Sequence, residues 1–221
     1  MVEILAYHGW AGYSGIWDRW SKHIDDRVSI ASYNRGYFGN PEQVGFTHGS
    51  THKIIFAHSY GLHFVPEDQL DECDLLVVFC SFQGFHFGSD TEKERSRRAL
   101  LSMILKFPKE PHRVLADFWA GMHHPESNSQ WGRAKINNEE LLLSDLQELG
   151  ASQLTYAMDK KWLCIEGGQD NIVYGSRLDE LKELFGTNVK HMVFHNAGHA
   201  VPLTKFRDSW SYIKANIPNF E

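Results

Sequence analysis

The stretch Ile54-Ile55-Phe56-Ala57-His58-Ser59-Tyr60-Gly61 joins an apolar, strand-like run to a serine that has small residues two positions before and two positions after it. Small residues at those positions let a strand turn sharply into a helix and leave the serine hydroxyl exposed at the carboxyl edge of a sheet. The pattern is close to a nucleophile elbow, with Ala57 where glycine is usual. The alternative is that Ser59 only caps a helix beginning at Tyr60, a common role of serine.

Short apolar runs recur on both sides of this stretch, and helix-length segments lie between several of them. The runs are too short for helices and too continuously apolar for a sheet with one wet face, so they predict buried parallel strands. Strands that alternate with helices predict an α/β fold, with a mostly parallel sheet flanked by helices. The expected strands are 2–7, 28–31, 53–57, 74–80, 162–165 and 191–194; the expected helices are 14–23, 176–185 and 204–217, with a weak one at 46–52.

The interval from residue 85 to residue 151 breaks this alternation. It holds helical candidates at 92–105 and 138–149, separated by prolines, and no persuasive strand. Helices inserted between neighbouring strands would form a cap over one edge of the core. We therefore expect a core interrupted by a helical cap or lid, with the divisions 1–84, 85–151 and 152–221.

Three other segments place polar groups just after expected strands. His8-Gly9-Trp10 follows the first strand, where an exposed turn can present the Trp10 backbone N–H beside the serine, although the first two residues alone are an ordinary turn. Asp170 follows the fifth strand, and by itself it could be a turn-forming residue. His199 follows the sixth strand. Because loops after parallel strands meet at one edge of a sheet, these groups are expected near Ser59.

The chain order Ser59, Asp170, His199 is that of α/β-hydrolases and differs from the orders of the two main serine protease folds. The whole chain resembles this superfamily. Within it, the chain is similar to the pimeloyl-[acyl-carrier protein] methyl ester esterases of biotin synthesis. That similarity rests on His8-Gly9-Trp10, Trp17, the turn at 33–39 and the loop at 197–200.

The resemblance implies a serine carboxylesterase with an acyl-enzyme intermediate and no cofactor, acting on a methyl ester of an acyl chain held by acyl carrier protein. Ser59 would be the nucleophile, His199 the general base and Asp170 its orienting acid, with Glu166 as the reserve acid. The backbone N–H groups of Trp10 and Tyr60 would hold the oxyanion. The sheet should have about six strands, since the chain begins directly at the strand before His8.

Other functions share the same signatures. Related carboxylesterases, lactonases and thioesterases are alternatives within the superfamily, as is carbon–carbon or cyanohydrin cleavage, because fold and triad do not fix the substrate. A general short-chain esterase or thioesterase is thus open, and so is a non-catalytic ligand receptor that keeps the triad. Two departures from the pattern, Ala57 and Tyr174 in place of a common proline, remove no reacting group.

Apolar side chains in and near the expected cap are candidates for an acyl pocket, with ordinary packing as the alternative. Metal catalysis is disfavoured although the chain has thirteen histidines, because the adjacent pair His123-His124 does not share a helix face and no HExxH pattern accompanies it. Cys80 is expected to be a small buried apolar residue. The candidate pocket residues are Phe82, Phe85, Phe118, Trp119, Met122 and Trp131.

The net charge is −6, which disfavours general nucleic-acid binding. The net charge of the interval 91–113 is positive, because it has seven basic and three acidic side chains. Such a reversal can mark a docking surface for an acidic partner such as acyl carrier protein. The alternative is a solvated helix with local ion pairs, for example Glu94 with Arg98. The candidate docking residues are Arg95, Arg97, Arg98 and Lys106.

The remaining features concern compartment. Three cysteines without CxxC spacing predict neither a disulfide framework nor a zinc ribbon. The first residues lack the basic region of a signal peptide, and no run approaches the ~20 apolar residues of a membrane span. We therefore expect a cytoplasmic protein with a small acyl ester as substrate, without a membrane span.

Overall fold

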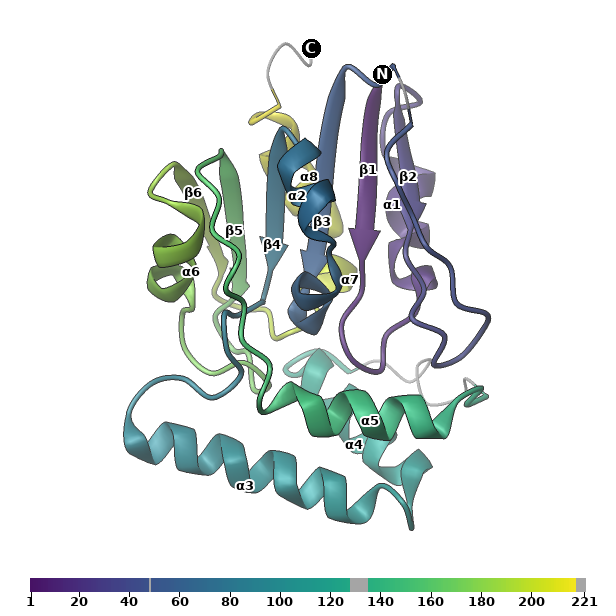
Figure 1. Ribbon diagram of the computed structural model, residues 1–221, viewed down its shortest axis with the longest axis vertical. Coiled ribbons are helices and arrows are strands. Elements are labelled where there is room, and N and C mark those ends of the chain that lie inside the picture. The colour runs from purple at the N-terminus through teal and green to yellow at the C-terminus, as the bar shows by residue number, and fades with distance from the viewer. Residues whose placement is uncertain (48, 128–134, 218–221) are drawn as a thin grey trace.

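A six-stranded sheet in the order β2-β1-β3-β4-β5-β6 forms the centre of the molecule, and all of its neighbouring strands are parallel (Figure 1). The computed structural model describes residues 1–47, 49–127 and 135–217. The prediction of a mostly parallel sheet of about six strands is confirmed. The strands are β1 (Val2–Tyr7), β2 (Val28–Ser32), β3 (His52–His58), β4 (Leu75–Phe79), β5 (Trp162–Gly167) and β6 (Val189–Phe194).

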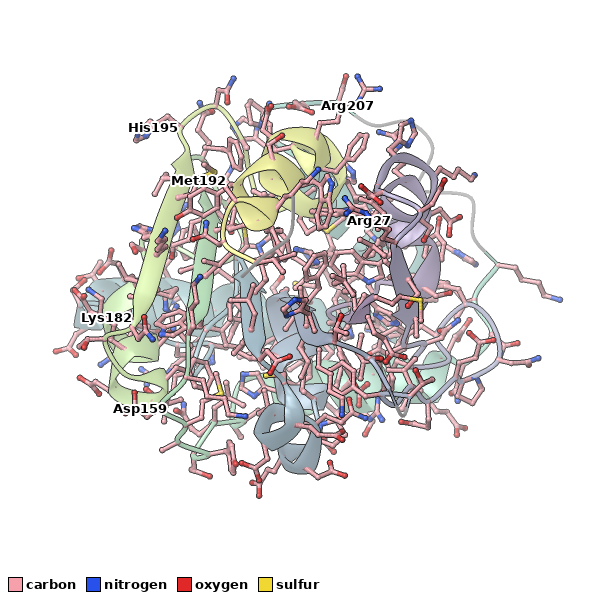
Figure 2. The ribbon with its side chains drawn as sticks, turned by 90° about the horizontal axis from the view of Figure 1, so that it is seen from above. Arg27, Asp159, Lys182, Met192, His195 and Arg207 are labelled. Atoms are coloured by element: carbon pink, nitrogen blue, oxygen red, sulfur yellow. The ribbon has the colours of Figure 1, made fainter. Side chains whose placement is uncertain are left out.

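Alternating side chains of the inner strands supply two separate apolar layers, because successive residues of a strand point to opposite faces. On β1, Ile4 belongs to one layer and Leu5 to the other, and both are fully buried. Seen from above, helices lie along both faces, with labelled Lys182 on α6 and labelled Met192 on β6 (Figure 2). The first layer is covered by η1 (Ser14–Trp17), α1 (Asp18–His23) and α8 (Phe206–Lys214), and the second by α2 (Glu67–Glu72) and α6 (Leu178–Phe185).

Two expected helices of the core differ from the structure. The segment expected as one helix at 204–217 is divided into α7 (Val201–Thr204) and α8, with Lys205 between them. The helix at 46–52 is wrong for the described part of that segment. There Thr47 donates from its backbone N–H and Ser50 from its hydroxyl to the buried carboxylate of Glu3, at 2.9 and 2.5 Å. Side-chain bonds of this kind compete with the helical backbone pattern.

A helical insertion, α3 (Asp90–Lys106), α4 (Pro111–His123) and α5 (Glu139–Leu149), lies between β4 and β5 in the chain, across the carboxyl ends of the strands (Figure 1). α3 begins with a capping box between Ser89 and Glu92, and Asn138 caps α5. α4 is absent from the sequence prediction, because prolines inside a helical pattern usually break it. Pro111 instead occupies the first turn of α4, where a missing N–H costs nothing.

The base of the helical insertion is fixed to the core. The backbone N–H of Leu154, leaving the insertion, donates to the carbonyl of Gln83, entering it, and Gly84 pairs with Gln153 as an antiparallel bridge. Beside them the fully buried guanidinium of Arg177 hydrogen-bonds to the carbonyl of Gly84. A buried cation needs a partner, and Glu180 supplies it at 2.6 Å. None of the described helices is long and apolar enough to cross a membrane.

Candidate active site

Ser59 stands where β3 ends and the 3-10 helix η2 (Ser59–Phe64) begins. Its φ is +56°, a left-handed conformation that non-glycine residues rarely adopt and that concentrates at functional sites. A Cβ on Gly61 would lie 2.7 Å from the carbonyl oxygens of Tyr7 and His8, so only glycine fits two positions after the serine. The alternative of Ser59 as a helix cap is wrong, since His58 holds the N-cap position and provides no side-chain cap.

The turn after β1 packs directly against Ser59. The Gly12 N–H donates to the carbonyl of Gly9 at 3.1 Å, which places Trp10 at the tip of the turn. A Cβ on Gly9 would lie 2.8 Å from Ser59 Cβ and 3.2 Å from its Oγ, so the absence of a side chain leaves room beside the Ser59 hydroxyl. Trp10 and Tyr60, whose N–H groups were predicted to form the oxyanion hole, thus both lie next to Ser59.

His8 holds this turn in place, a role that no sequence motif indicates. Its Nε2 accepts from the Arg35 N–H at 3.1 Å, so the proton is on Nδ1, which donates to the Gly9 carbonyl at 2.9 Å. Burial lowers the pKa of His8 to about 4, which keeps the imidazole neutral at pH 7. The neutral ring therefore links the turn at Gly9 to the loop at Arg35.

Two indoles connect the same turn to the helical insertion. Trp10 Nε1 donates to the carbonyl of Leu142 on α5 at 2.8 Å, and Trp119 Nε1 on α4 donates to the carbonyl of Ala11 at 3.1 Å. Both rings are buried. The geometry of the turn is thus fixed from the core by His8 and from the insertion by two tryptophans.

Asp170 and His199 meet at the carboxyl ends of β5 and β6. Asp170 Oδ2 and His199 Nδ1 are 2.7 Å apart, and Asp170 Oδ1 accepts from the backbone N–H groups of Ile172 and Val173 at 2.8 and 2.9 Å. The carboxylate can therefore orient the imidazole with Nδ1 protonated. His199 Nε2 is buried and has no hydrogen-bond partner among the described residues, Ser59 Oγ included.

The loop that carries His199 is held by two groups that sequence reasoning missed. His58 Nε2 donates to the His199 carbonyl at 3.0 Å, and the two ring centroids are 4.8 Å apart. Burial lowers the pKa of His58 well below its ordinary value, so this neighbour carries no charge at pH 7. From the other side, the Met122 carbonyl at the end of α4 accepts from the Ala200 N–H at 3.0 Å.

Glu166, the reserve acid, lies elsewhere. Its carboxylate accepts from Ser176 Oγ at 2.8 Å and from the Arg177 N–H at 2.8 Å, and it lies 2.6 Å from Nε2 of His191 on β6. These bonds engage both of its oxygens without His199. The acid in contact with His199 is therefore Asp170.

An apolar cavity of about 560 Å³, its mouth included, opens beside Ser59 and Tyr60 between the core and the helical insertion. Phe82, Phe85 and Phe118 of the predicted pocket residues line it. Trp119 instead packs beside Phe38, with ring centroids 5.6 Å apart, and Trp131 lies outside the described residues. Further lining side chains, which helical periodicity alone does not separate from ordinary core, are Leu100, Met103, Leu146, Leu149, Ile172 and Tyr174.

Comparisons with known proteins agree on the architecture. No protein-family model matches the chain, and no curated protein does. Among solved structures, an esterase from Exiguobacterium antarcticum superposes with a TM-score of 0.72 at 11% identity, covering 98% of this chain and 91% of that one. A bromoperoxidase from Bacillus anthracis superposes with a TM-score of 0.76 at 13% identity, covering 96% of this chain and 90% of that one. An epoxide hydrolase from Bacillus megaterium superposes with a TM-score of 0.69 at 14% identity, covering 96% of this chain and 92% of that one. The chain has the α/β-hydrolase fold.

In this α/β-hydrolase fold, the basic candidates all stand on α3. The Arg95 guanidinium lies 4.7 Å from the ring centroid of Tyr174, which lines the large cavity, so Arg95 is near the rim of that cavity. Arg98 forms the ion pair with Glu94 that the alternative interpretation predicted, at 2.7 Å and largely exposed. Arg97 and Lys106 are exposed.

Two groups of side chains in the described part of the hydrolase fold have atoms close enough to share a metal ion, within 4.8 Å of one another. One combines Cys80 with Asp170 and His199, and the other Cys164 with Glu166 and His191. Burial raises the pKa of both thiols well above the ordinary value. Because a metal binds the thiolate, a thiol that stays protonated weakens either group as a metal site.

Proposed function

We propose that this α/β-hydrolase-fold protein is a serine carboxylesterase that works through an acyl-enzyme. The observation that carries the proposal is a strained serine at an elbow, Ser59, that borders the same cavity as His199, whose imidazole lies 2.7 Å from the carboxylate of Asp170. A nucleophile, a base and an orienting acid in these roles favour acyl transfer as the reaction class.

The mechanism assigns one task to each group. As Ser59 Oγ attacks the ester carbonyl, its proton passes to His199 Nε2, which then gives a proton to the departing alcohol. A water repeats the sequence and releases the acid. Asp170 keeps Nδ1 protonated and stabilises the imidazolium, while the N–H groups of Trp10 and Tyr60 stabilise the oxyanion. The Ser59–His199 hydrogen bond forms when substrate closes the site, since such bonds are often long in free enzymes.

For the substrate, we propose an apolar acyl chain presented as a methyl ester on acyl carrier protein, as the resemblance implies. The apolar walls of the large cavity suit such a chain. Arg95 near its rim and the exposed Arg97 and Lys106 give an acidic carrier a complementary face. Residues 85–151 then act as a cap between core parts 1–84 and 152–221, and a cytoplasmic role in biotin synthesis belongs to the same proposal.

The test is turnover of methyl pimeloyl-carrier beside free short-chain and long-chain esters and thioesters, with Ser59→Ala as the control. A preference for the carrier-borne ester supports the full proposal. Equal or better turnover of free esters or thioesters would leave the general esterase or thioesterase. Tight binding of an ester with turnover no faster than that of Ser59→Ala would instead identify a ligand receptor.

A further inference from the structure

A second, smaller cavity lies on the other side of Ser59. Counted with its open mouth, it has about 340 Å³ of space not filled by atoms, compared with about 560 Å³ for the large cavity counted in the same way. Its closed part has room for about one water molecule, and the large cavity has room for several. Ser59, Trp10 and Phe118 border both cavities, so the two meet at the nucleophile. The walls that belong to the small cavity alone include Gly12, Ile16, Met122, His199, Pro202 and Leu203.

The position of His199 distinguishes the two cavities chemically. His199 borders the small cavity and not the large one, and its Nε2 is buried without a hydrogen-bond partner among the described residues. During acylation the bond between Ser59 Oγ and the carbonyl carbon forms, and the bond from that carbon to the alcohol oxygen breaks. The alcohol oxygen keeps the electron pair and takes the proton from His199 Nε2. The alcohol must therefore leave on the side where His199 lies, which is the side of the small cavity.

From this geometry we propose that the small cavity is the alcohol subsite, and that it accepts the alkyl group of short, unbranched, uncharged alcohols. The inference rests on the proposed esterase function and assigns the two halves of the substrate to two cavities. Apart from His199 and His58, the side chains that border the small cavity are apolar or small, and none is a carboxylate or an ammonium group. An apolar alkyl group is stabilised there, whereas a charged or polyhydroxylated alcohol would lose its hydration without compensation.

Met122 and Leu203 set the size limit of this subsite. Met122 comes from the end of α4 in the helical insertion, and Leu203 comes from α7 in the core. Met122 is buried and Leu203 half-buried, so each has neighbours that fix its side chain. A longer alkyl group has to displace one of the two. After the alcohol has left, the same space admits the water that His199 activates.

Two series of free esters test the assignment. The first varies the alcohol in methyl, ethyl, butyl and hexyl hexanoate, and the second varies the acid in methyl esters from acetate to dodecanoate. For the wild type, kcat/KM should fall about tenfold or more from the methyl to the butyl ester, the discrimination that a tight apolar pocket achieves. Leu203→Ala and Met122→Ala should each raise the butyl-to-methyl ratio by about tenfold and leave the preferred acid unchanged. Leu203→Phe should lower the ratio.

Matched controls separate the two cavities. Met103→Ala, in the large cavity, should change the preferred acid and leave the butyl-to-methyl ratio as it is. Leu101→Ala, 55% exposed on the outer side of α3, should change neither preference. Because Leu203 is half-buried, its variants keep the test decisive if Met122→Ala fails to fold.

The outcomes distinguish the failure of the alcohol subsite from the failure of the proposed esterase function. If the wild type hydrolyses the esters but Leu203→Ala leaves the butyl-to-methyl ratio unchanged, the alcohol subsite is overturned and the esterase stands. The same conclusion follows if Leu203→Ala changes the preferred acid instead of that ratio. Failure of the wild type to hydrolyse any of the esters would overturn the esterase, and the alcohol subsite with it.

Discussion

The sheet and the helical insertion contribute different parts of the candidate site. Ser59, Asp170 and His199 all lie at or after the ends of core strands, and each accepts a hydrogen bond from another residue of the core, Ser59 and His199 through their backbone carbonyls and Asp170 through its carboxylate. The walls of the large cavity, by contrast, come in large part from α3, α4 and α5. In the proposed esterase, the core supplies the three reacting side chains, and the insertion supplies much of the wall that a substrate contacts. Changes in the core should damage turnover of every substrate, whereas changes in the insertion should alter the choice among substrates.

The largest expected effect is in the core. Ser59→Ala should reduce kcat for all esters by on the order of 10⁶, the size of the loss when such a nucleophile is removed from a serine protease. The thermal midpoint of unfolding should stay close to that of the wild type, as the change removes one hydroxyl. A folded variant with more than about a tenth of the wild-type activity would show that Ser59 is not the nucleophile.

The orienting acid comes next. Asp170→Asn should lower kcat by about 10⁴, because the amide no longer keeps His199 in the required tautomer. Added to Ser59→Ala, it should cost little more, since the residues act as one unit. Glu166→Gln is the matched control, and it should keep kcat within about tenfold. If Glu166→Gln were the more damaging of the two, the assignment of the acid would be wrong.

A third prediction concerns the stability of the core below neutral pH. Burial lowers the pKa of His8 and of His63 from 6.5 to about 4. Both groups bind protons more readily in the unfolded chain, so their stabilisation is fully present above pH 6.5 and is lost as the pH falls towards 4. Each should contribute a loss of about 2 kcal/mol in the free energy of unfolding by pH 5.

Urea unfolding at pH 7, 6 and 5 measures this loss. His63 accepts from the Ser152 hydroxyl and donates to the Phe82 carbonyl, and glutamine can make both kinds of bond without titrating. His63→Gln should therefore flatten the pH dependence by about the share of one histidine, about 2 kcal/mol at pH 5. An unchanged pH dependence would mean that His63 is protonated in the folded protein.

The smallest effect is expected on the outer surface of the insertion. Changing Arg95, Arg97, Arg98 and Lys106 to Glu should raise KM for a carrier-borne ester by about tenfold while KM for a small neutral ester stays close to the wild-type value. Salt should weaken the wild-type carrier reaction in the same selective way, since the Debye length shrinks from ~10 Å at 0.1 M to ~3 Å at 1 M. Equal effects on both esters would indicate damage to the helices, and no effect on either would leave α3 as a solvated helix.

The sequence was most informative where strands end. A nucleophile elbow, a turn after the first strand and loops after β5 and β6 depend on a few small or polar residues at fixed places, and parallel strands bring their carboxyl ends together whatever the side chains between them. For this reason the strands, the parallel order and the proximity of Asp170 and His199 could be predicted. The positions of Gly9 and Gly61 have the same basis, since a Cβ at either would collide with its neighbours.

Sequence reasoning was least informative where contacts between distant residues determine the position of a helix or the role of a side chain. α4 was missed because a proline in a first turn cannot be told from a helix breaker without the rest of the helix. The division between the two cavities was also out of reach, since helical periodicity does not show that Phe118 borders both cavities while Met122, four residues later on the same helix, borders only the small one. The buried roles of His8 and His58 depend on the backbone groups of Arg35 and His199, which are distant in the chain.

The bridge between Gly84 and Gln153 marks the place where a different helical insertion could be engineered into this fold. The chain leaves the core and returns to it through two adjacent backbone positions, held together by hydrogen bonds and by the buried pair of Arg177 and Glu180. The chain of the insertion therefore enters and leaves the core at one place, while Trp10, Trp119 and Met122 hydrogen-bond the insertion to the turn after β1 and to the loop that carries His199. A different set of helices whose ends lie equally close together could be grafted at these two residues without altering any strand, and it would keep the candidate site in place only if it supplied equivalent hydrogen bonds to the turn after β1 and to the loop that carries His199.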